Sequence, residues 1–365
     1  MTIPVAAPVR WFEQHQQAVA AAVAGVMSGG QYILGPRVDA FERAFAAFCA
    51  CPHAVAVASG TDAITLGLRV LDAAGGEVIT SAHTAVATVA AIERAGAIPV
   101  VADIDPVTHC LCPESVASVL SPRTRAIVAV HIFGHPADLR GLRAVTGSRA
   151  IGLVEDCAQA VLARTHDRPV GSLGDVGCFS LHPLKTLNAC GDGGVITTND
   201  ADLARQFKVL RNIGLRTRED CAVWSHNSRL DTLQAAMLLV KLDLLPAWTE
   251  ARRAHARFYQ QQLADVVQTP LDQPFEYAVY HTFVVQASAR DALRAFLTEK
   301  GVGTAIHYPA PIHVQQAAAS LGYQPNDFPE TMAQAGRIVS LPVYPELTEA
   351  QRHYVVEQVR SFYDR

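Results

Sequence analysis

Between residues 176 and 185 the chain reads Val176-Gly177-Cys178-Phe179-Ser180-Leu181-His182-Pro183-Leu184-Lys185. The apolar run at its start predicts a strand, which delivers a serine and then one lysine into a turn that contains proline. Because a charged lysine is costly to bury, it is normally solvated or given a partner. A half-buried lysine with a lowered pKa also attacks carbonyl groups to make a Schiff base. Lys185 is therefore a candidate nucleophile, and a solvated surface lysine is the alternative.

A second strand-like run ends in two acids. The chain reads Ile151-Gly152-Leu153-Val154-Glu155-Asp156 and continues with Cys157-Ala158-Gln159. Ligands of open α/β sheets bind beyond the carboxyl ends of the strands, so we expect Asp156 and Lys185 to face one crevice. Such a pair suits pyridoxal phosphate, in which the lysine holds the cofactor and the carboxylate keeps the ring nitrogen protonated. The alternative role for Asp156 is the N-cap of the next helix.

A third segment predicts an anion site. An apolar strand in Ala56-Val57-Ala58 breaks at Ser59-Gly60-Thr61-Asp62, and a helix with regularly spaced apolar residues follows. Free N–H groups and the helix dipole attract anions at such a junction, so we expect Gly60 and Thr61 to bind a cofactor phosphate together with Ser180. The alternative is a well-capped helix start without a ligand. The charge of Asp62 repels phosphate unless its side chain points away.

The first 210 residues alternate apolar runs with amphipathic ones, which predicts a mostly parallel sheet covered by helices. The helix expected at Pro36–Cys49 places Val38, Phe41, Phe45 and Phe48 on one face. The expected strands are Glu77–Thr80, Pro99–Ala102, Ala126–Ile132, Ala150–Glu155, Val176–Phe179 and Val195–Thr198.

The remaining sequence predicts a second unit. The polar stretch Arg211–Ser225 is expected to be a loop, and the apolar spacing that follows predicts helices at Ser228–Leu245 and Ala247–Leu263. From Pro270 the chain has short apolar runs and many prolines. We therefore expect a large cofactor-binding domain over residues 1–245 and a smaller α+β domain over residues 246–365.

Composition narrows the function classes. The chain has 365 residues, half of them apolar, which allows a substantial core. A net charge of −4 without a basic run argues against nucleic-acid binding. The N-terminus lacks a signal pattern, and Ala18–Met27 is too short to span a bilayer, so we expect a cytoplasmic location and no membrane partner.

Metal chemistry is not expected. The eight cysteines do not form paired metal-binding knuckles, and reduced structural thiols are predicted. His131 and His135 have the spacing of metal ligands on a helix, but they follow a strand-like run and enclose Phe133 and Gly134. We therefore predict no metal site.

Along nearly its whole length the chain resembles the sugar aminotransferases named for DegT, DnrJ, EryC1 and StrS, which are fold-type I pyridoxal-phosphate enzymes. The similarity rests on motifs that occur in order at family-like intervals. Besides the segments above, they are Gly30–Pro36, Glu77–Thr80, Val101–Pro106, Val130–Asp138, Asn227–Ala236, Ile306–Pro309 and Ser340–Pro345. The resemblance implies an aspartate-aminotransferase-like fold and the cofactor pyridoxal 5'-phosphate, with pyridoxamine phosphate as its intermediate form.

The family's site residues carry over position by position. Lys185 matches the Schiff-base lysine and Asp156 the partner of the pyridine nitrogen, and both are catalytic. The other cofactor-binding positions match Gly60, Thr61, Asp62, His83, Gln159, Ser180 and Asn227. Asn227 matches an asparagine that reaches the phosphate of the other subunit, which implies a homodimer with shared sites. Positions near the substrate or amino donor match Arg229, His307 and Tyr308.

Two positions depart from the family pattern. Members usually carry an aromatic residue that stacks on the pyridine ring after the threonine that matches Thr84, and here Ala85 follows it. His83 is the candidate for part of that stacking. His182 stands where Tyr or Phe is common, and it is interpreted as a packing variant or as an added proton shuttle.

The resemblance implies transfer of an amino group from L-glutamate to the keto group of a nucleotide-linked sugar. The segment Asn227–Ala236 resembles the form seen in members that act at C3, whereas members that act at C4 more often carry an aromatic residue after the asparagine. The physical reason offered is that the small Ser228 leaves room where a ring would stand, and that Arg229 can grip an anion with two hydrogen bonds. Alternatives are amination at C4, a cyclitol-type aminotransferase, a sugar dehydratase, which typically replaces the lysine with histidine, and a non-enzymatic regulator on this fold.

Overall fold

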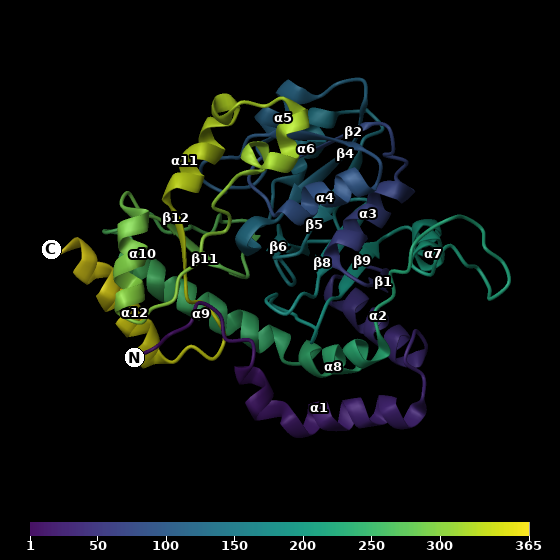
Figure 1. Ribbon diagram of the computed structural model, residues 1–365, viewed down its shortest axis with the longest axis horizontal. Helices are drawn as coiled ribbons and strands as arrows, with labels where there is room; N and C mark the ends of the chain where they lie inside the picture. Colours follow the sequence, from purple (N-terminus) through teal and green to yellow (C-terminus); the bar gives the residue numbers. More distant parts are fainter. Residues whose placement is uncertain (365) are drawn as a thin grey trace.

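A seven-stranded sheet organises the larger part of the molecule (Figure 1). The computed structural model describes residues 1–364. In the order β1-β9-β8-β5-β4-β2-β3, neighbouring strands are parallel except that β9 is antiparallel to both β8 and β1. The strands are β1 (His53–Val57), β2 (Glu77–Ser81), β3 (Ile98–Ala102), β4 (Thr124–Val130), β5 (Gly152–Asp156), β8 (Val176–Ser180) and β9 (Gly194–Thr198). The predicted mostly parallel sheet is confirmed.

Helices cover both faces of this sheet, which explains why its strands are nearly continuous apolar runs. In β4, Ala126 and Val128 join the core beneath α3, α4 and α7, whereas Ile127 and Ala129 join the core beneath α5 and α6. The helices of this region are α1 (Arg10–Gly29), α2 (Pro36–Phe48), α3 (Gly60–Val70), α4 (Val86–Arg94), α5 (Pro113–Val119), η1 (Ile132–Gly134), α6 (Leu139–Thr146), α7 (Ala201–Leu210) and α8 (Thr232–Leu242).

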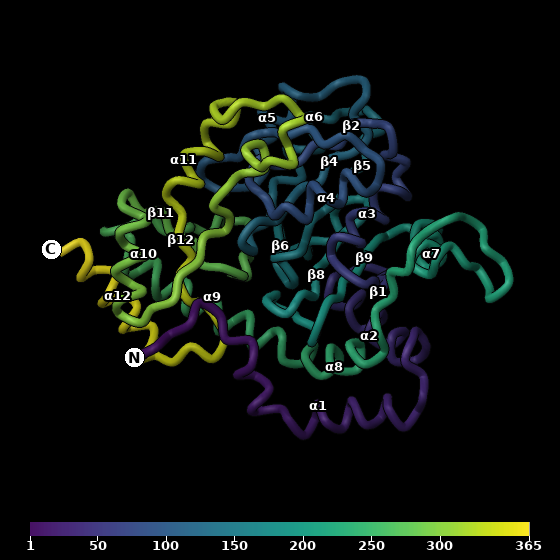
Figure 2. Tube along the Cα trace, in the orientation of Figure 1, coloured from purple at the N-terminus to yellow at the C-terminus, as the bar shows by residue number. Residues whose placement is uncertain are grey.

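Two details differ from the sequence-based expectation. No helix separates β8 from β9, so the alternation of strands and helices breaks where the chain carries Lys185. The helix expected from Ser228 begins at Thr232, because Asn227 and Asp231 form bridges with Asn212 and Ile33. Between α7 and α8 the chain forms the expected loop, which projects from the body of the molecule (Figures 1 and 2).

A second hydrophobic core lies toward the C-terminal end of the chain. Its centre is the antiparallel pair β11–β12, and Ile3 at the N-terminus also packs into it. The elements here are α9 (Leu245–Leu263), β11 (Phe283–Gln286), α10 (Arg290–Glu299), η2 (Ile312–Val314), η3 (Gln316–Leu321), η4 (Pro325–Asp327), α11 (Pro329–Arg337), β12 (Ile338–Leu341) and α12 (Glu349–Tyr363). A small sheet, β6 (Arg164–Thr165), β7 (Arg168–Pro169) and β10 (Glu276–Tyr277), completes the strands.

Helix α9 contributes buried residues to both hydrophobic cores. Leu245 at its start packs into the core beneath α2 and α8, and Tyr259 and Leu263 pack into the second core. The expected domain division at residue 245 thus falls at the start of a shared helix, and it stays a prediction.

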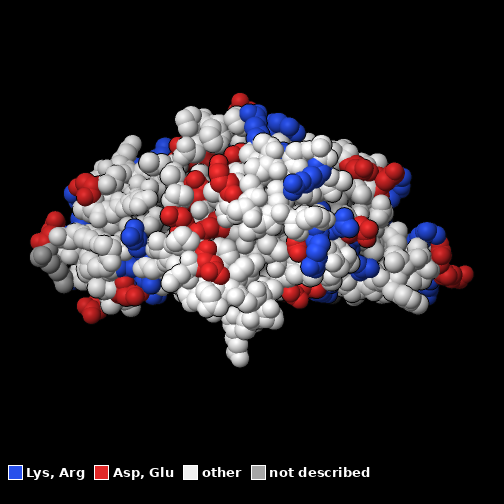
Figure 3. Space-filling view, turned by 90° about the horizontal axis from the view of Figure 1, so that it is seen from above, with Lys and Arg blue, Asp and Glu red and all other residues white. Residues whose placement is uncertain are grey.

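The surface carries charges of both signs. On the face shown in Figure 3, basic and acidic side chains are interspersed. Within residues 1–364, no helix is both long and apolar enough to cross a bilayer.

Candidate active site

The carboxyl ends of β1, β5 and β8 meet at one edge of the sheet, since these three strands run in the same direction. A cleft of about 250 Å³ lies at this edge. Side chains and turns from these strand ends form its walls, as expected for a doubly wound fold. Of the predicted residues it brings together Gly60, Thr61, Asp156, Gln159, Ser180 and Lys185. It is also lined by Ser59, Thr84, Ala85, Thr88, His182 and Asp192.

Lys185 lies in the turn after β8. Its backbone N–H donates to the carbonyl of His182 at 2.8 Å, which closes the turn and holds the lysine at the cleft. Burial lowers the pKa of Lys185, and the charge of Asp156 opposes this effect in part. Within the described chain, its amine has no hydrogen-bond partner. An amine that is half-buried, unpartnered and easier to deprotonate is suited to nucleophilic and proton-transfer chemistry.

Asp156 is fixed by two donors. It is 4% exposed, and its Oδ2 accepts a hydrogen bond from the Thr88 hydroxyl at 2.8 Å while its Oδ1 accepts from the backbone N–H of Ala158 at 3.1 Å. Because Thr88 gives its proton to Asp156, the 3.0 Å contact between the Thr84 and Thr88 hydroxyls has Thr84 as donor. Sequence reasoning missed Thr88. The four-residue spacing of Thr84 and Thr88 after β2 is a signal that could have identified it.

The start of α3 closely approaches Ser180. A Cβ atom placed on Gly60 would lie 2.7 Å from the Ser180 Cβ, so only glycine allows the helix N-terminus to come this near. The Ser59 hydroxyl caps the helix by accepting from the Asp62 N–H at 3.0 Å. The remaining N–H groups, the helix dipole and the Ser180 hydroxyl fit a phosphate group.

The Asp62 side chain points away from this cleft. Its Oδ1 pairs with Arg94 at 2.6 Å, and its Oδ2 accepts from the Ser228 hydroxyl at 2.6 Å. The carboxylate is thus neutralised behind the helix start, where it does not repel an anion in the cleft. Ser228 is fully buried at this contact and does not line the cleft of its own chain.

Gln159 connects the cleft to a distant segment. Its amide oxygen accepts from the Phe133 N–H at 2.6 Å, and its amide nitrogen donates to the Tyr308 hydroxyl at 3.0 Å. Burial and the charge of Asp156 raise the pKa of Tyr308 to about 12, so the phenol stays neutral at physiological pH. The neighbouring His307 contacts the Ser340 hydroxyl through Nδ1 at 2.8 Å.

His83 does not line the cleft. Its ring is buried, and its Nε2 lies 3.0 Å from the His307 carbonyl oxygen and 3.3 Å from the backbone nitrogen of Tyr308. Burial lowers the pKa of His83 to about 4, so the ring is neutral at physiological pH. Ala85, and not an aromatic side chain, forms the adjacent wall.

Asn227 and Arg229 lie outside the cleft of their own chain. Asn227 is exposed, and its side-chain oxygen accepts from Arg229 Nε at 2.8 Å. A second guanidinium nitrogen of Arg229 donates to the Asn212 side chain at 3.2 Å. The two residues therefore form a polar surface group next to the projecting loop.

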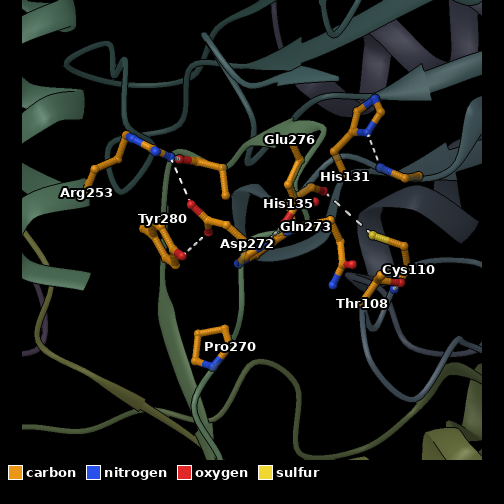
Figure 4. A network of polar contacts seen from close by, with 12 residues as sticks. Thr108, Cys110, His131, His135, Arg253, Pro270, Asp272, Gln273, Glu276 and Tyr280 are labelled. Carbon is orange, nitrogen blue, oxygen red and sulfur yellow. Dashed lines mark hydrogen bonds and ion pairs between the residues drawn. The ribbon is translucent and has the colours of Figure 1, made fainter. Parts of the chain in front are cut away.

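His131 and His135 contact different partners. The ring of His131 accepts from the Ala137 N–H at Nδ1 (2.9 Å), so its Nε2–H donates to the buried Glu155. His135 instead faces Glu276 at 3.1 Å, in the network that Figure 4 shows. Burial alone would raise the pKa of Glu155, but the hydrogen bonds from His131 and from backbone amides hold it below its usual value. Each histidine is thus part of a satisfied polar network.

Comparison with known proteins identifies the family. The model of the DegT/DnrJ/EryC1/StrS aminotransferase family matches residues 13–360. The chain belongs to this family. DegT/DnrJ/EryC1/StrS proteins are pyridoxal-phosphate-dependent aminotransferases, which agrees with the lysine and aspartate that face the cleft.

Some relatives of this DegT/DnrJ/EryC1/StrS protein are named as regulatory or sensory proteins, and others are named as sugar transaminases. It is 42% identical to the "erythromycin biosynthesis sensory transduction protein EryC1" of Saccharopolyspora erythraea, covering 92% of this chain and 93% of that one. It is 39% identical to a "pleiotropic regulatory protein" of Geobacillus stearothermophilus, and the match covers 100% of this chain and 99% of that one. It is 38% identical to the dTDP-3-amino-3,4,6-trideoxy-alpha-D-glucose transaminase of Streptomyces venezuelae, and the match covers 97% of this chain and 94% of that one.

Two solved structures of similar proteins have the same fold. The structure of S. venezuelae DesV in complex with a ketimine intermediate superposes with a TM-score of 0.97 at 38% identity, covering 100% of this chain and 99% of that one. The structure of NtdA from Bacillus subtilis contains bound pyridoxamine phosphate. It superposes with a TM-score of 0.91 at 26% identity, covering 96% of this chain and 82% of that one.

Proposed function

We propose that the chain transfers an amino group from L-glutamate to the C3 keto group of a nucleotide-linked sugar. The observation that carries this proposal is the unpartnered amine of Lys185 in one cleft with the doubly held carboxylate of Asp156. The name of the S. venezuelae relative, a 3-amino sugar transaminase, supports the substrate class and the carbon. Amination at C4 remains the alternative for regiochemistry.

The cleft residues fit the family cofactor. Gly60, Thr61 and Ser180 would hold its phosphate, Asp156 its ring nitrogen and Gln159 its ring hydroxyl. When bound, pyridoxal phosphate supplies an electron-withdrawing ring that stabilises negative charge on the carbon that loses a proton.

Two side chains have defined tasks in this reaction. Asp156 is oriented by Thr88 and Ala158, and its negative charge favours a protonated ring nitrogen. Lys185 would hold the cofactor before the donor arrives, and its freed amine would then carry the proton that leaves the donor carbon. A pKa lowered by burial makes the freed amine a better base near neutral pH.

The exchange of Lys185 for alanine tests this assignment. The Lys185→Ala protein should fold and bind pyridoxal phosphate without a covalent bond, but lose both the visible absorption band of the lysine-bound cofactor and turnover. If the variant keeps either one, the assignment of Lys185 is wrong. A panel of 3-keto and 4-keto nucleotide sugars, offered to the enzyme loaded with pyridoxamine phosphate, then decides between C3 and C4.

We also propose a homodimer in which Asn227 reaches the cofactor phosphate of the partner. Its exposure and its distance from the cleft of its own chain support this proposal. Mixing Lys185→Ala subunits with Asn227→Ala subunits should produce heterodimers in which one site carries both changes and the other is intact. Exchange of subunits without regained activity would mean that each site is built from one chain.

A regulator is the second candidate function, because two of the most similar relatives carry regulatory names. Such a protein would not need Lys185, Asp156, Gln159 and Ser180 at one cleft. Purified protein that acquires no visible absorption band with pyridoxal phosphate and converts no keto sugar would favour the regulator.

A further inference from the structure

A second cavity, distinct from the cofactor cleft, is also lined by Lys185. It has a volume of about 220 Å³ and lies between the lysine turn, the N-terminal segment, α9 and the chain after β12. Trp11 and Trp248 give it apolar walls, and Arg252, His281 and His307 give it polar ones. Pockets for drug-sized ligands span roughly 300–1,000 Å³, so this space suits a smaller molecule than a nucleotide sugar.

Arg252 is the unusual group in this cavity. Only its Nη1 has hydrogen-bond partners in residues 1–364, which are the carbonyls of His281 at 3.4 Å and of Val343. The other guanidinium donors have no hydrogen-bond partner in that part of the chain, and Arg252 is half-buried and lines the cavity. Buried arginines are normally paired with carboxylates, because an uncompensated cation is costly away from water.

The cavity is lined by two basic side chains, those of Lys185 and Arg252, and by one acidic side chain, that of Glu346. Glu346 interacts with Arg252 electrostatically and also lines the cavity, but the two form no ion pair in residues 1–364. Burial lowers the pKa of Arg252 to about 10, so it remains charged at neutral pH. Burial, followed by the charges of Lys185 and Arg252, lowers the pKa of His281 well below its usual value.

A small anion would complete this arrangement. A carboxylate can accept two parallel hydrogen bonds from the free edge of a guanidinium, and the pair is strongest where water is excluded. Lys185 also lines this cavity, so a molecule anchored at Arg252 shares the cavity with the candidate nucleophile.

We propose that this cavity is the amino-donor subsite, and that Arg252 binds a carboxylate of the donor amino acid. The proposal rests on the aminotransferase function proposed above, and it places only the carboxylate end of the donor in this cavity. The apolar walls at Trp11 and Trp248 would accommodate the methylene groups of a donor such as glutamate.

The next arginine on α9 provides a matched control. Arg253 also uses a guanidinium nitrogen to bind a backbone carbonyl, that of Ala278, and it lies near Asp272 at 3.4 Å (Figure 4). Arg253 does not line the donor cavity. A comparison of Arg252→Gln with Arg253→Gln therefore separates loss of an anion site from loss of a carbonyl-binding arginine.

The first measurement is the donor half-reaction. The spectrum of the enzyme loaded with pyridoxal phosphate is followed after mixing with increasing concentrations of L-glutamate. Arg252→Gln should raise the apparent dissociation constant for glutamate by about 10- to 100-fold, the loss expected for a charged hydrogen bond. Arg253→Gln should change it less than threefold, and the constant for the nucleotide sugar should stay within threefold in both variants. An equal response of the two variants to glutamate would overturn the proposal.

The second measurement does not depend on turnover. Calorimetric titration of the wild-type protein should detect binding of glutarate but not of its neutral analogue glutaramide, and Arg252→Gln should abolish the glutarate signal. If Arg252→Gln does not fold, Arg252→Lys takes its place, and it should bind glutarate more weakly than wild type because lysine offers a point charge in place of a planar fork. Equal heats for glutarate and glutaramide would refute an anion site. If glutarate binds while glutamate gives no spectral change, the subsite stands and the proposed donor reaction fails.

Discussion

Replacing Thr88 with valine tests how much the reaction depends on the orientation of Asp156. Valine has nearly the shape of threonine but no hydroxyl, so Oδ2 of Asp156 loses its 2.8 Å donor and the carboxylate keeps only the Ala158 N–H. A hydrogen bond to a charged group contributes about 1.5–3 kcal/mol. At about 1.4 kcal/mol for each factor of ten, kcat should fall by about 10- to 150-fold if the reaction requires this orientation.

The assay compares kcat of Thr88→Val, Thr88→Ser and Thr84→Val at saturating cofactor, with thermal unfolding measured in parallel. Thr88→Ser keeps the hydroxyl and should stay within a few-fold of wild type. Thr84→Val removes only the donor to Thr88 and should have the smaller effect of the two valine exchanges. A Thr88→Val enzyme as active as Thr88→Ser would refute the role of Thr88 as a positioning residue.

Three further predictions follow from the buried contacts around the site. Gly60→Ala should lower the free energy of unfolding by about 1–3 kcal/mol and weaken cofactor retention, since its Cβ would lie 2.7 Å from Ser180 Cβ; denaturation and cofactor titration measure both. Burial lowers the pKa of His83 from its ordinary value of 6.5 to about 4, so the unfolded chain binds the proton first as the pH falls. Stability should therefore be full above pH 6.5 and fall by about 3 kcal/mol toward pH 4, and His83→Gln should flatten that profile in urea titrations. Lys241→Met removes the 2.6 Å bond to the Asn188 carbonyl near the lysine turn and should lower kcat by about 10- to 100-fold with cofactor still bound, which steady-state kinetics and absorbance check.

The sheet and the central residues of the site could be predicted from local sequence. Apolar runs such as Val176–Phe179 can be satisfied only as buried strands, and parallel strands deliver the residues after them to one edge. Asp156, Ser180 and Lys185 therefore followed from their places at strand ends, without knowledge of what packs around them.

The rest depended on contacts between residues far apart in the chain. Asp62 turns from the cleft because Arg94 and Ser228 hold it, and Gln159 meets Tyr308 across 149 positions. The spacing of apolar residues indicates whether a segment is a helix or a strand, but not how that element is rotated relative to its neighbours. It therefore could not show that Thr88 contacts Asp156 or that His83 does not line the cleft.

The sequence by itself thus determined the fold class, the strand ends and the place of Lys185 in the turn after a strand, because periodicity and turn chemistry are local properties. Only the tertiary structure decided which polar groups are left without partners. Arg252 is the example: on sequence it is one arginine beside another on a helix, and only the packing of α9 against β12 and the N-terminal segment leaves its guanidinium at a cavity with free donors. Hydrogen-bond satisfaction is a property of the whole fold, since the partner of each buried group can come from any part of the chain.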